Sequence, residues 1–203
     1  MKKKIILSIF CCLSVLLIAT GCSKEFNDNE ITNYLQDKYN KNFTFVGEGD
    51  DVWSSNTITK IYSDNNKNEF KIKINDDYLS DNYYSVIYDE EISKYYQNEF
   101  TSSYKVFVSS ESYYTNNSKS YTNVNEYIDD IVGLNVSIYT TDNNIETTKN
   151  KLDKIIFNGN YVSGVIYVVS NDDFVNITDY NNNSIDILNS EPFSFTNGIL
   201  DKE

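Results

Sequence analysis

The sequence has no histidine and no arginine, since all 17 basic residues among its 203 are lysines. Without histidine, the Ser-His-Asp and Cys-His catalytic systems and any zinc or iron site that uses imidazole are excluded. Without arginine, there is no guanidinium group for bidentate recognition of phosphate or carboxylate. The 30 acidic residues give a formal net charge of −13, and this sign argues against a nucleic-acid partner, which is itself a polyanion.

The N-terminal residues have the composition of a targeting segment. Lys2, Lys3 and Lys4 precede an apolar run over residues 5–20, and small residues then lead into Cys22. This order is typical of a secretory signal peptide, which is removed from the mature protein. The run has 16 residues, fewer than the roughly 20 that a helix needs to span a bilayer, so a permanent transmembrane anchor is the weaker interpretation.

The end of this segment carries a more specific pattern. Residues 18–22 read Ile-Ala-Thr-Gly-Cys, which resembles the lipobox of bacterial lipoprotein precursors, with Ala19 where that family usually has leucine. The resemblance implies that the Cys22 thiol receives a diacylglyceryl group and that the chain is cut just before it. Two acyl chains on one residue give stable anchoring, whereas one chain binds a membrane only marginally. The implied location is the extracytoplasmic face of the cell membrane, with the membrane as a partner through the lipid on Cys22.

The cysteine count supports this interpretation. Cys11 and Cys12 lie in the segment that would be removed, so Cys22 would be the only cysteine of the mature chain and would have no disulfide partner. The alternative is that Cys22 is an ordinary thiol beyond a conventional cleavage site. A single cysteine directly after the glycine that ends a signal peptide favours lipidation.

The chain is expected to divide into a signal peptide at residues 1–21, a lipidated cysteine with a short polar tether at 22–29, and a single domain at 30–203. The mature chain would have 182 residues, with 14 lysines against 30 acidic residues and a formal charge of −16. That length suffices for one well-buried core and leaves little for two. A division within the polar, turn-rich stretch at residues 109–122 is the alternative.

Hydrophobic periodicity predicts the secondary structure. Apolar residues repeat at helical spacing over residues 31–39, 84–95, 124–132 and 145–156. The first of these helices is preceded by a capping-box pattern, Asn27 with Glu30. Strands are expected at residues 57–62, 70–74, 104–108, 134–138, 161–169, 174–179 and 184–188. This order predicts an α+β fold with about four helices and a largely antiparallel sheet, in which the run at 161–169, apolar on both faces, is a central strand.

The loop at residues 47–53, Gly-Glu-Gly-Asp-Asp-Val-Trp, has the most unusual composition and contains the only tryptophan. Sugar-binding sites often place an aromatic ring beside carboxylates and amides, and a glycosidase needs two carboxylates about 5–10 Å apart. Glu48, Asp50, Asp51 and Trp53 are therefore candidate ligand-binding residues. The alternative interpretation is a loop between strands whose tryptophan packs into the sheet.

Tyrosine is abundant, with 18 residues, and adjacent pairs occur at residues 83–84, 95–96 and 113–114. In each pair, one ring is expected to face the core and its neighbour the rim. Tyrosine is enriched at recognition surfaces, although a half-buried tyrosine is also an ordinary core residue. Tyr113 and Tyr114 have the most polar sequence surroundings and are the candidate exposed pair for ligand binding.

Turns rich in Asn and Asp raise the possibility of calcium binding. Asp64, Asn66 and Asn68 have the first spacing of an EF-hand loop, but Glu69 replaces the glycine of the sharp turn and Asn75 the bidentate glutamate. A second run at residues 179–190 fails in the same way. Hairpin turns explain both segments better, so the sequence predicts no metal site and no cofactor.

Beyond the leader, the chain resembles the small uncharacterised lipoproteins of low-GC Gram-positive bacteria. The resemblance lies in the general character of YLQDKYN, FTFVG and DNYYSVIYDEEI, and it implies no activity and no catalytic residue. The first hypothesis is a non-enzymatic lipoprotein that binds an envelope protein, peptide or saccharide. The second is a carboxylate-dependent hydrolase that uses Glu48, Asp50 or Asp51, and the third is a calcium-dependent structural module.

Overall fold

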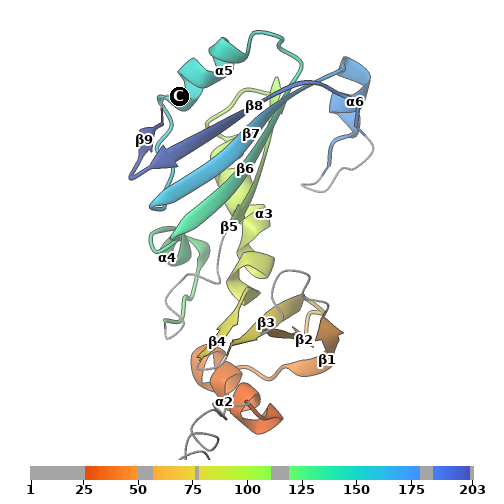
Figure 1. The fold of residues 1–203 in the computed structure, drawn as a ribbon, viewed down its shortest axis with the longest axis vertical. Helices are drawn as coiled ribbons and strands as arrows, with labels where there is room; N and C mark the ends of the chain where they lie inside the picture. Colours follow the sequence, from red (N-terminus) through yellow and green to blue (C-terminus); the bar gives the residue numbers. More distant parts are fainter. Residues whose placement is uncertain (1–25, 50–56, 76–77, 111–118, 179–184, 202–203) are drawn as a thin grey trace, which may run out of the picture.

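The computed structural model describes residues 26–49, 57–75, 78–110, 119–178 and 185–201. Within these ranges the chain forms five helices and nine strands, and the fold is α+β as the sequence predicts. The strands form two separate sheets at opposite ends of an elongated molecule (Figure 1). The sequence predicts one largely antiparallel sheet, and the division into two sheets is a correction to that prediction.

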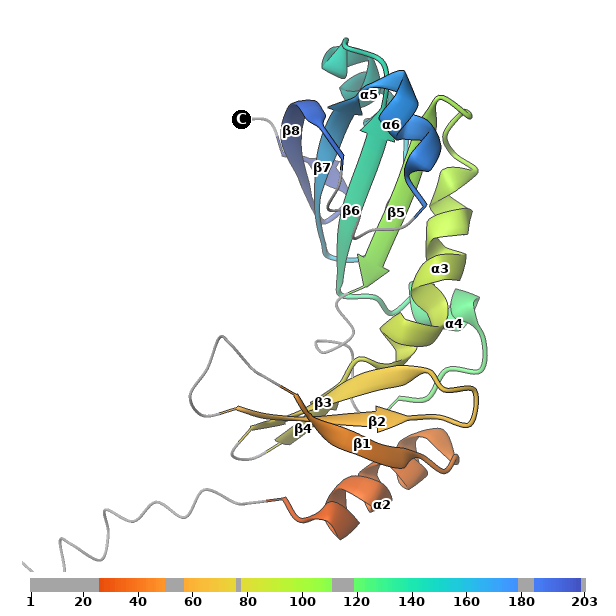
Figure 2. The same cartoon turned by 90° about the vertical axis from the view of Figure 1, so that its right-hand side faces the viewer.

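The N-terminal sheet has four antiparallel strands in the order β1-β2-β3-β4, and one helix packs against it. Its elements are α2 (Asp28–Tyr39), β1 (Thr44–Gly49), β2 (Ile58–Ser63), β3 (Glu69–Asn75) and β4 (Tyr78–Asp81). Figure 2 shows α2 on one side of this sheet and the rest of the molecule on the other.

The start of α2 forms as its sequence predicts. The Asn27 side chain accepts a hydrogen bond from the Glu30 amide at 3.0 Å, and the Glu30 carboxylate accepts one from the Asn27 amide at 3.0 Å. This capping box satisfies two of the amides that a helix N-terminus leaves unpaired. On the next turn, Ile31 is fully buried and Leu35 nearly so, which fixes α2 against the sheet.

Alternation along β3 gives the N-terminal sheet one apolar and one polar face. Phe70, Ile72 and Ile74 are buried on the side of α2, whereas Lys71 and Lys73 lie on the opposite side. Because side chains that face each other across strands point to the same side of a sheet, the remaining strands follow this division. The polar face is therefore turned toward the C-terminal sheet (Figure 2).

The C-terminal sheet has the order β5-β6-β7-β8-β9, and only its β6–β7 pair is parallel. Its strands are β5 (Tyr104–Ser110), β6 (Gly133–Thr140), β7 (Tyr161–Val169), β8 (Ile187–Thr196) and β9 (Ile199–Leu200). Its helices are α3 (Tyr83–Gln97), α4 (Val124–Ile128), α5 (Ile145–Leu152) and α6 (Asn171–Asn176). The middle place of β7 confirms the prediction of a central strand at residues 161–169.

One connected hydrophobic cluster includes buried residues of both sheets and of the helices between them. Aromatic rings carry it across the junction: the Tyr39 ring of α2 lies 5.0 Å from that of Tyr84 of α3, which lies 5.4 Å from that of Tyr127 of α4. A continuous core is the mark of one domain. The described residues on both sides of the stretch at 109–122 belong to this core.

Several element boundaries differ from those predicted. Residues 174–179 were expected to be a strand, but α6 occupies residues 171–176, capped by the Ser170 hydroxyl, which accepts a hydrogen bond from the Asp173 amide at 3.1 Å. Gly47, Glu48 and Gly49 belong to strand β1 and not to a loop. The four-residue strand β4 was not predicted at all.

Candidate functional site

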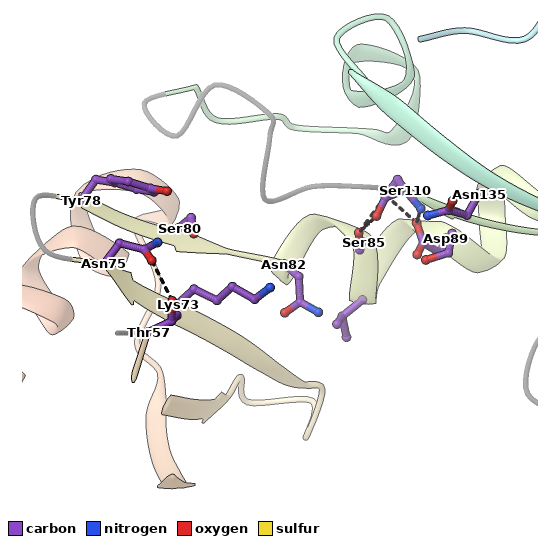
Figure 3. A pocket seen from close by; sticks show the side chains of 12 residues that line it. Thr57, Lys73, Asn75, Tyr78, Ser80, Asn82, Ser85, Asp89, Ser110 and Asn135 are labelled. Atoms are coloured by element: carbon purple, nitrogen blue, oxygen red, sulfur yellow. Dashed lines mark hydrogen bonds between the residues drawn. The ribbon is translucent and has the colours of Figure 1, made fainter. Parts of the chain in front are cut away.

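A cavity of about 690 Å³ lies between the polar face of the N-terminal sheet and the near end of the C-terminal sheet. We call it the inter-sheet pocket. Figure 3 shows Tyr78, Asn75 and Thr57 at one end, and Asp89, Ser110 and Asn135 among the residues at the other. A cavity of this volume is within the usual range for a small-molecule site.

The N-terminal sheet supplies one wall through side chains of its polar face. Tyr78 stands opposite Asn75 in the register of β3 and β4, and Ser80 stands opposite Lys73. The Thr57 hydroxyl donates a hydrogen bond to the Asn75 side-chain oxygen at 3.0 Å. The Tyr78 residue is 56% exposed, so its ring is a surface that a ligand can cover without disturbing the core.

The other wall contains a network of hydroxyls around Asp89 of α3. The Ser110 amide and hydroxyl both donate to Asp89 Oδ1, at 3.0 and 2.6 Å. The Ser110 Oγ also lies 2.7 Å from the Tyr127 hydroxyl and 2.8 Å from Ser85 Oγ, and Ser85 donates to the Ser110 carbonyl at 2.6 Å. These contacts fix the carboxylate and the end of β5 relative to α3 and α4.

Asp89 has an unusual pKa for an aspartate. Burial raises its pKa from the ordinary value to about 6, although the hydrogen bonds from Ser110 act in the opposite direction. A carboxyl group with this pKa changes its charge between pH 5 and 7. It can therefore present either a carboxylate or a neutral acid to the inter-sheet pocket under ordinary conditions.

Asp89 also belongs to a polar stripe along α3 that covers the edge of β5. The Ser93 hydroxyl accepts from the Val108 amide at 2.8 Å, and the Gln97 side-chain oxygen accepts from the Val106 amide at 2.8 Å. Successive side chains among Asp89, Ser93 and Gln97 are four residues apart, which is about 6 Å along a helix. The β5 amides that they accept from are two residues apart, which is about 6.8 Å along a strand. The near match lets the helix satisfy the sheet edge where a further strand would otherwise pair.

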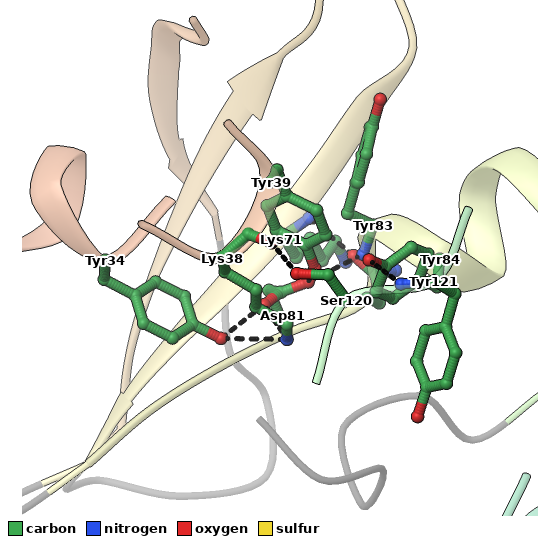
Figure 4. Close-up of polar contacts among 10 residues, drawn as sticks. Tyr34, Lys38, Tyr39, Lys71, Asp81, Tyr83, Tyr84, Ser120 and Tyr121 are labelled. Atoms are coloured by element: carbon green, nitrogen blue, oxygen red, sulfur yellow. Dashed lines mark hydrogen bonds and ion pairs between the residues drawn. The ribbon is translucent and has the colours of Figure 1, made fainter. Parts of the chain in front are cut away.

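A second cluster of charges lies on the other face of the N-terminal sheet, under α2 (Figure 4). The Asp81 carboxylate is 1% exposed and pairs with the Lys38 ammonium at 2.9 Å. The hydroxyls of Tyr34 and Tyr39 donate to it at 2.5 Å each, and the Tyr83 amide donates at 3.0 Å. Burial, and then the nearby Asp81, raise the pKa of both hydroxyls, so they stay protonated and serve as donors.

The chemistry of the inter-sheet pocket is hydrogen bonding. Asp89 is the only acid, and Lys73 the only base, among the described residues that line it. In the described ranges no group of three or more His, Cys, Asp or Glu side chains could hold a metal ion. The helices of those ranges include none long and apolar enough to cross a membrane.

The structure places one of the loop candidates away from this pocket. Glu48 pairs in register with Lys60, whose ammonium contacts Asp28 of α2 at 2.6 Å, so Glu48 lies on the α2 side of the sheet. The other candidates lie outside the described residues, namely Cys22, Asp50, Asp51, Trp53, Tyr113 and Tyr114. The inter-sheet pocket contains the same three kinds of group, with Asp89 and Asn135 toward one end and Tyr78 at the other.

Two other expectations have clear outcomes. Tyr83 and Tyr84 are both buried, so the prediction that one faces the rim is wrong, whereas Tyr96 is buried and Tyr95 half-exposed as predicted.

Asp64 Oδ1 accepts hydrogen bonds from the amides two and four residues further on, at 2.8 and 2.9 Å. This local bonding forms the turn of the β2–β3 hairpin, as preferred over calcium binding.

Sequence reasoning missed the residues that line the inter-sheet pocket. A signal was present for Asp89, because Asp89, Ser93 and Gln97 form a polar stripe at intervals of four on a helix rich in tyrosine. Ser110 and Asn135 gave none, since Ser110 is the polar residue that ends β5 and Asn135 is a polar residue within β6. Their position depends on how the two sheets meet.

Comparisons with known proteins give little further information. No protein-family model matches the chain, and no curated protein matches it. Among solved structures, the chain is similar to the crystal structure of a DUF5037 family protein from Ruminococcus gnavus ATCC 29149. The identity is 12%, over 85% of this chain and 93% of that chain, with a TM-score of 0.39. A likeness at this level supports no argument about function.

Proposed function

We propose that the protein is a lipid-anchored, extracytoplasmic binding protein and that its inter-sheet pocket binds a saccharide that carries hydroxyl and acetamido groups. The anchor is proposed from the leader and Cys22. The binding role is proposed from one observation, the convergence of an aromatic ring, a carboxylate, amides and hydroxyls in a cavity of about 690 Å³.

The lining favours a saccharide over a peptide. Val86 is the only aliphatic side chain among the described residues of the pocket, whereas peptide recognition depends on apolar pockets for side chains. Asn75, Asn82 and Asn135 each bring an amide group with N–H donors to the pocket, while their side-chain oxygens accept hydrogen bonds within the protein. The Tyr78 ring offers a flat apolar surface for the carbon-bound face of a sugar ring.

Strand addition, a second mode of peptide binding, is blocked at the edge strand β5 of the C-terminal sheet. The outward amides of Val106, Val108 and Ser110 already donate to side chains of α3. A peptide strand would have to displace the whole helix to pair with β5.

The described lining of the inter-sheet pocket does not favour hydrolysis. A paired-carboxylate glycosidase needs two acids, and Asp89 is the only one that the described lining supplies. Of the acids in the hydrolase hypothesis, Glu48 lies on the other face of the N-terminal sheet, and Asp50 and Asp51 lie outside the described residues.

Calorimetry with N-acetylglucosamine tests the binding role. We expect saturable binding by the mature chain and about tenfold weaker binding by Tyr78→Ala, because stacking contacts of this kind contribute about 1–2 kcal/mol. Glu48→Gln is the matched control, since Glu48 lies on the opposite face of the same sheet, and it should bind like the wild type. Absence of binding at millimolar sugar, or equal binding by Tyr78→Ala, would contradict the proposal.

A further inference from the structure

A row of small polar residues crosses the C-terminal sheet on the face opposite the main core. Ser109 of β5 stands opposite Asn135 of β6, Asn135 opposite Ser163 of β7, and Ser163 opposite Ser194 of β8. Directly paired residues point to the same side of a sheet, so the four side chains lie side by side across four strands. We call these four residues the polar row.

The polar row begins in the inter-sheet pocket. Ser109 and Asn135 line that pocket, and Ser163 and Ser194 carry the row away from it. Neighbouring strands are about 4.8 Å apart, so the four positions span about 14 Å. The pocket therefore opens onto a line of hydrogen-bonding groups that a compact ligand could not occupy in full.

The same face is closed at its other end. Phe107, Tyr139 and Tyr167 form a second hydrophobic cluster there with Phe174 of α6 and Ile177. Figure 2 shows α6 over that end of the sheet, while the end nearer the N-terminal sheet carries no helix on this face. Burial of the apolar half leaves the polar row as the open half, with Ser163 exposed and Asn135 and Ser194 half-buried.

Hydrogen bonds within the row and to the neighbouring Asp201 hold its side chains in place. The Ser163 hydroxyl donates to the Asn135 side-chain oxygen at 2.7 Å, and the Ser194 hydroxyl donates to Asp201 at 2.7 Å. Each hydroxyl oxygen keeps acceptor capacity beyond the proton it donates. The row contains no charge of its own and no large side chain, which suits a neutral, extended ligand rich in hydroxyl groups.

We infer that the polar row extends the inter-sheet pocket into a binding track for a linear oligosaccharide, with one sugar in the pocket and further sugars along Ser163 and Ser194. This inference rests on the proposed function. It adds that the ligand is a chain, and that affinity depends on chain length.

The test compares N-acetylglucosamine with its β-1,4-linked tetramer by calorimetry. Wild-type protein should bind the tetramer about tenfold or more tightly than the monomer, since two or three extra hydrogen bonds suffice for that ratio. The double variant Ser163→Ala and Ser194→Ala should lose this preference. Ser194→Ala alone, which leaves the Ser163–Asn135 hydrogen bond in place, should weaken tetramer binding and keep the wild-type affinity for the monomer. Ser190→Ala is the matched control, because Ser190 is an exposed serine on β8, four residues from Ser194, and it should behave like the wild type.

Thermal unfolding of each variant confirms that it is folded before binding is compared. If the wild type binds both sugars equally, or if the double variant keeps the preference for the tetramer, the polar row is not a binding track, although the pocket proposal stands. If the wild type binds neither sugar, the proposed function fails, and the inference fails with it.

Discussion

At the scale of single residues, Asp89 is a site where burial and hydrogen bonding oppose each other. Burial raises its pKa to about 6, from an ordinary value of 3.8, against the effect of the Ser110 hydrogen bonds. The folded protein therefore binds a proton at this position more readily than the unfolded chain does. Between pH 4 and pH 6 this carboxyl group makes the folded state less favourable as pH rises.

The predicted consequence concerns Asp89→Asn, which resembles the protonated acid. In the wild type, ionisation of the Asp89 carboxyl should lower the free energy of unfolding by up to about 3 kcal/mol between pH 4 and pH 7, at about 1.4 kcal/mol per pKa unit. The variant has no carboxyl at this position and should not show that decrease. Urea unfolding at pH 4.5 and 7.5 gives the free energy of unfolding of both proteins. Subtracting one value from the other at each pH removes the contributions of the other acids, which the two proteins share. A difference that is the same at both pH values would contradict the raised pKa.

Asp81 and Lys38 give a second prediction, because their roles in the buried cluster are unequal. Asp81→Ala leaves a buried ammonium group and two tyrosine hydroxyls without their acceptor, and a loss of about 3–5 kcal/mol is expected. Lys38→Met keeps the apolar stem, and Asp81 keeps its hydroxyl and amide donors, so the loss should be about 2 kcal/mol smaller. Urea unfolding of both variants measures the asymmetry, and equal losses would show that the ion pair alone holds the cluster.

The sequence predicts residue roles where the interaction is local. The capping box of α2 follows from the spacing of Asn27 and Glu30, and the hairpin turn from Asp64 and its neighbours. Asp81 could not be identified in this way, because its partners come from α2, more than forty residues earlier in the sequence. From sequence alone a charged residue is expected to be exposed to solvent, and only the fold shows that it is buried with partners.

At the scale of elements, the contact between α3 and β5 replaces a strand pair by helix side chains. The double variant Ser93→Ala and Gln97→Ala should speed hydrogen exchange of the Val106 and Val108 amides about fivefold, since each loses a bond of about 1 kcal/mol. The amides of Lys105 and Phe107 are the internal control, because alternate residues of β5 point toward β6. Equal acceleration at all four amides would indicate loosening of the whole strand and not loss of the edge contacts.

The elements that were predicted well are those whose burial is simple. β7 is an apolar run in the middle of its sheet, and β3 alternates because one face meets α2. The helix α6 was missed because Phe174 and Ile177 were interpreted as strand residues, although Ser170 with Asp173 is a capping signal. β4 is too short to show a period, and its place depends on pairing with β3.

At the scale of the whole molecule, the α+β class follows from the order of elements, but the division into two sheets does not. Both sheets contain hairpins and alternating strands, and no local signal assigns a strand to one or the other. The division is set by α3, which packs on β5 and continues from β4 (Figure 1). The inter-sheet pocket arises from this arrangement, so its lining could not be predicted without it.

The anchor proposal has a consequence for how the molecule is held. The first helix of the described residues, α2, begins six residues after Cys22, at Asp28, and six residues of fully extended chain would reach about 20 Å. A lipid on Cys22 would therefore keep the N-terminal sheet close to the bilayer, while the C-terminal sheet with its polar row lies farther out.

Cys22→Ala should release the protein from the membrane fraction into the medium or leave it as an uncleaved precursor, since the variant has no sulfur to carry the lipid. Cys12→Ala is the matched control: it also removes one cysteine, but from the segment that cleavage discards, and it should fractionate with the membrane like the wild type. Mass spectrometry of the wild-type N-terminal peptide adds a direct measurement, with a chain that begins at Cys22 and carries the mass of its acyl groups. Two buried acyl chains give stable membrane anchoring, which a cleaved chain without them lacks. Identical fractionation of the two variants when both are cleaved, or an unmodified wild-type peptide that begins before Cys22, would therefore contradict the anchor proposal.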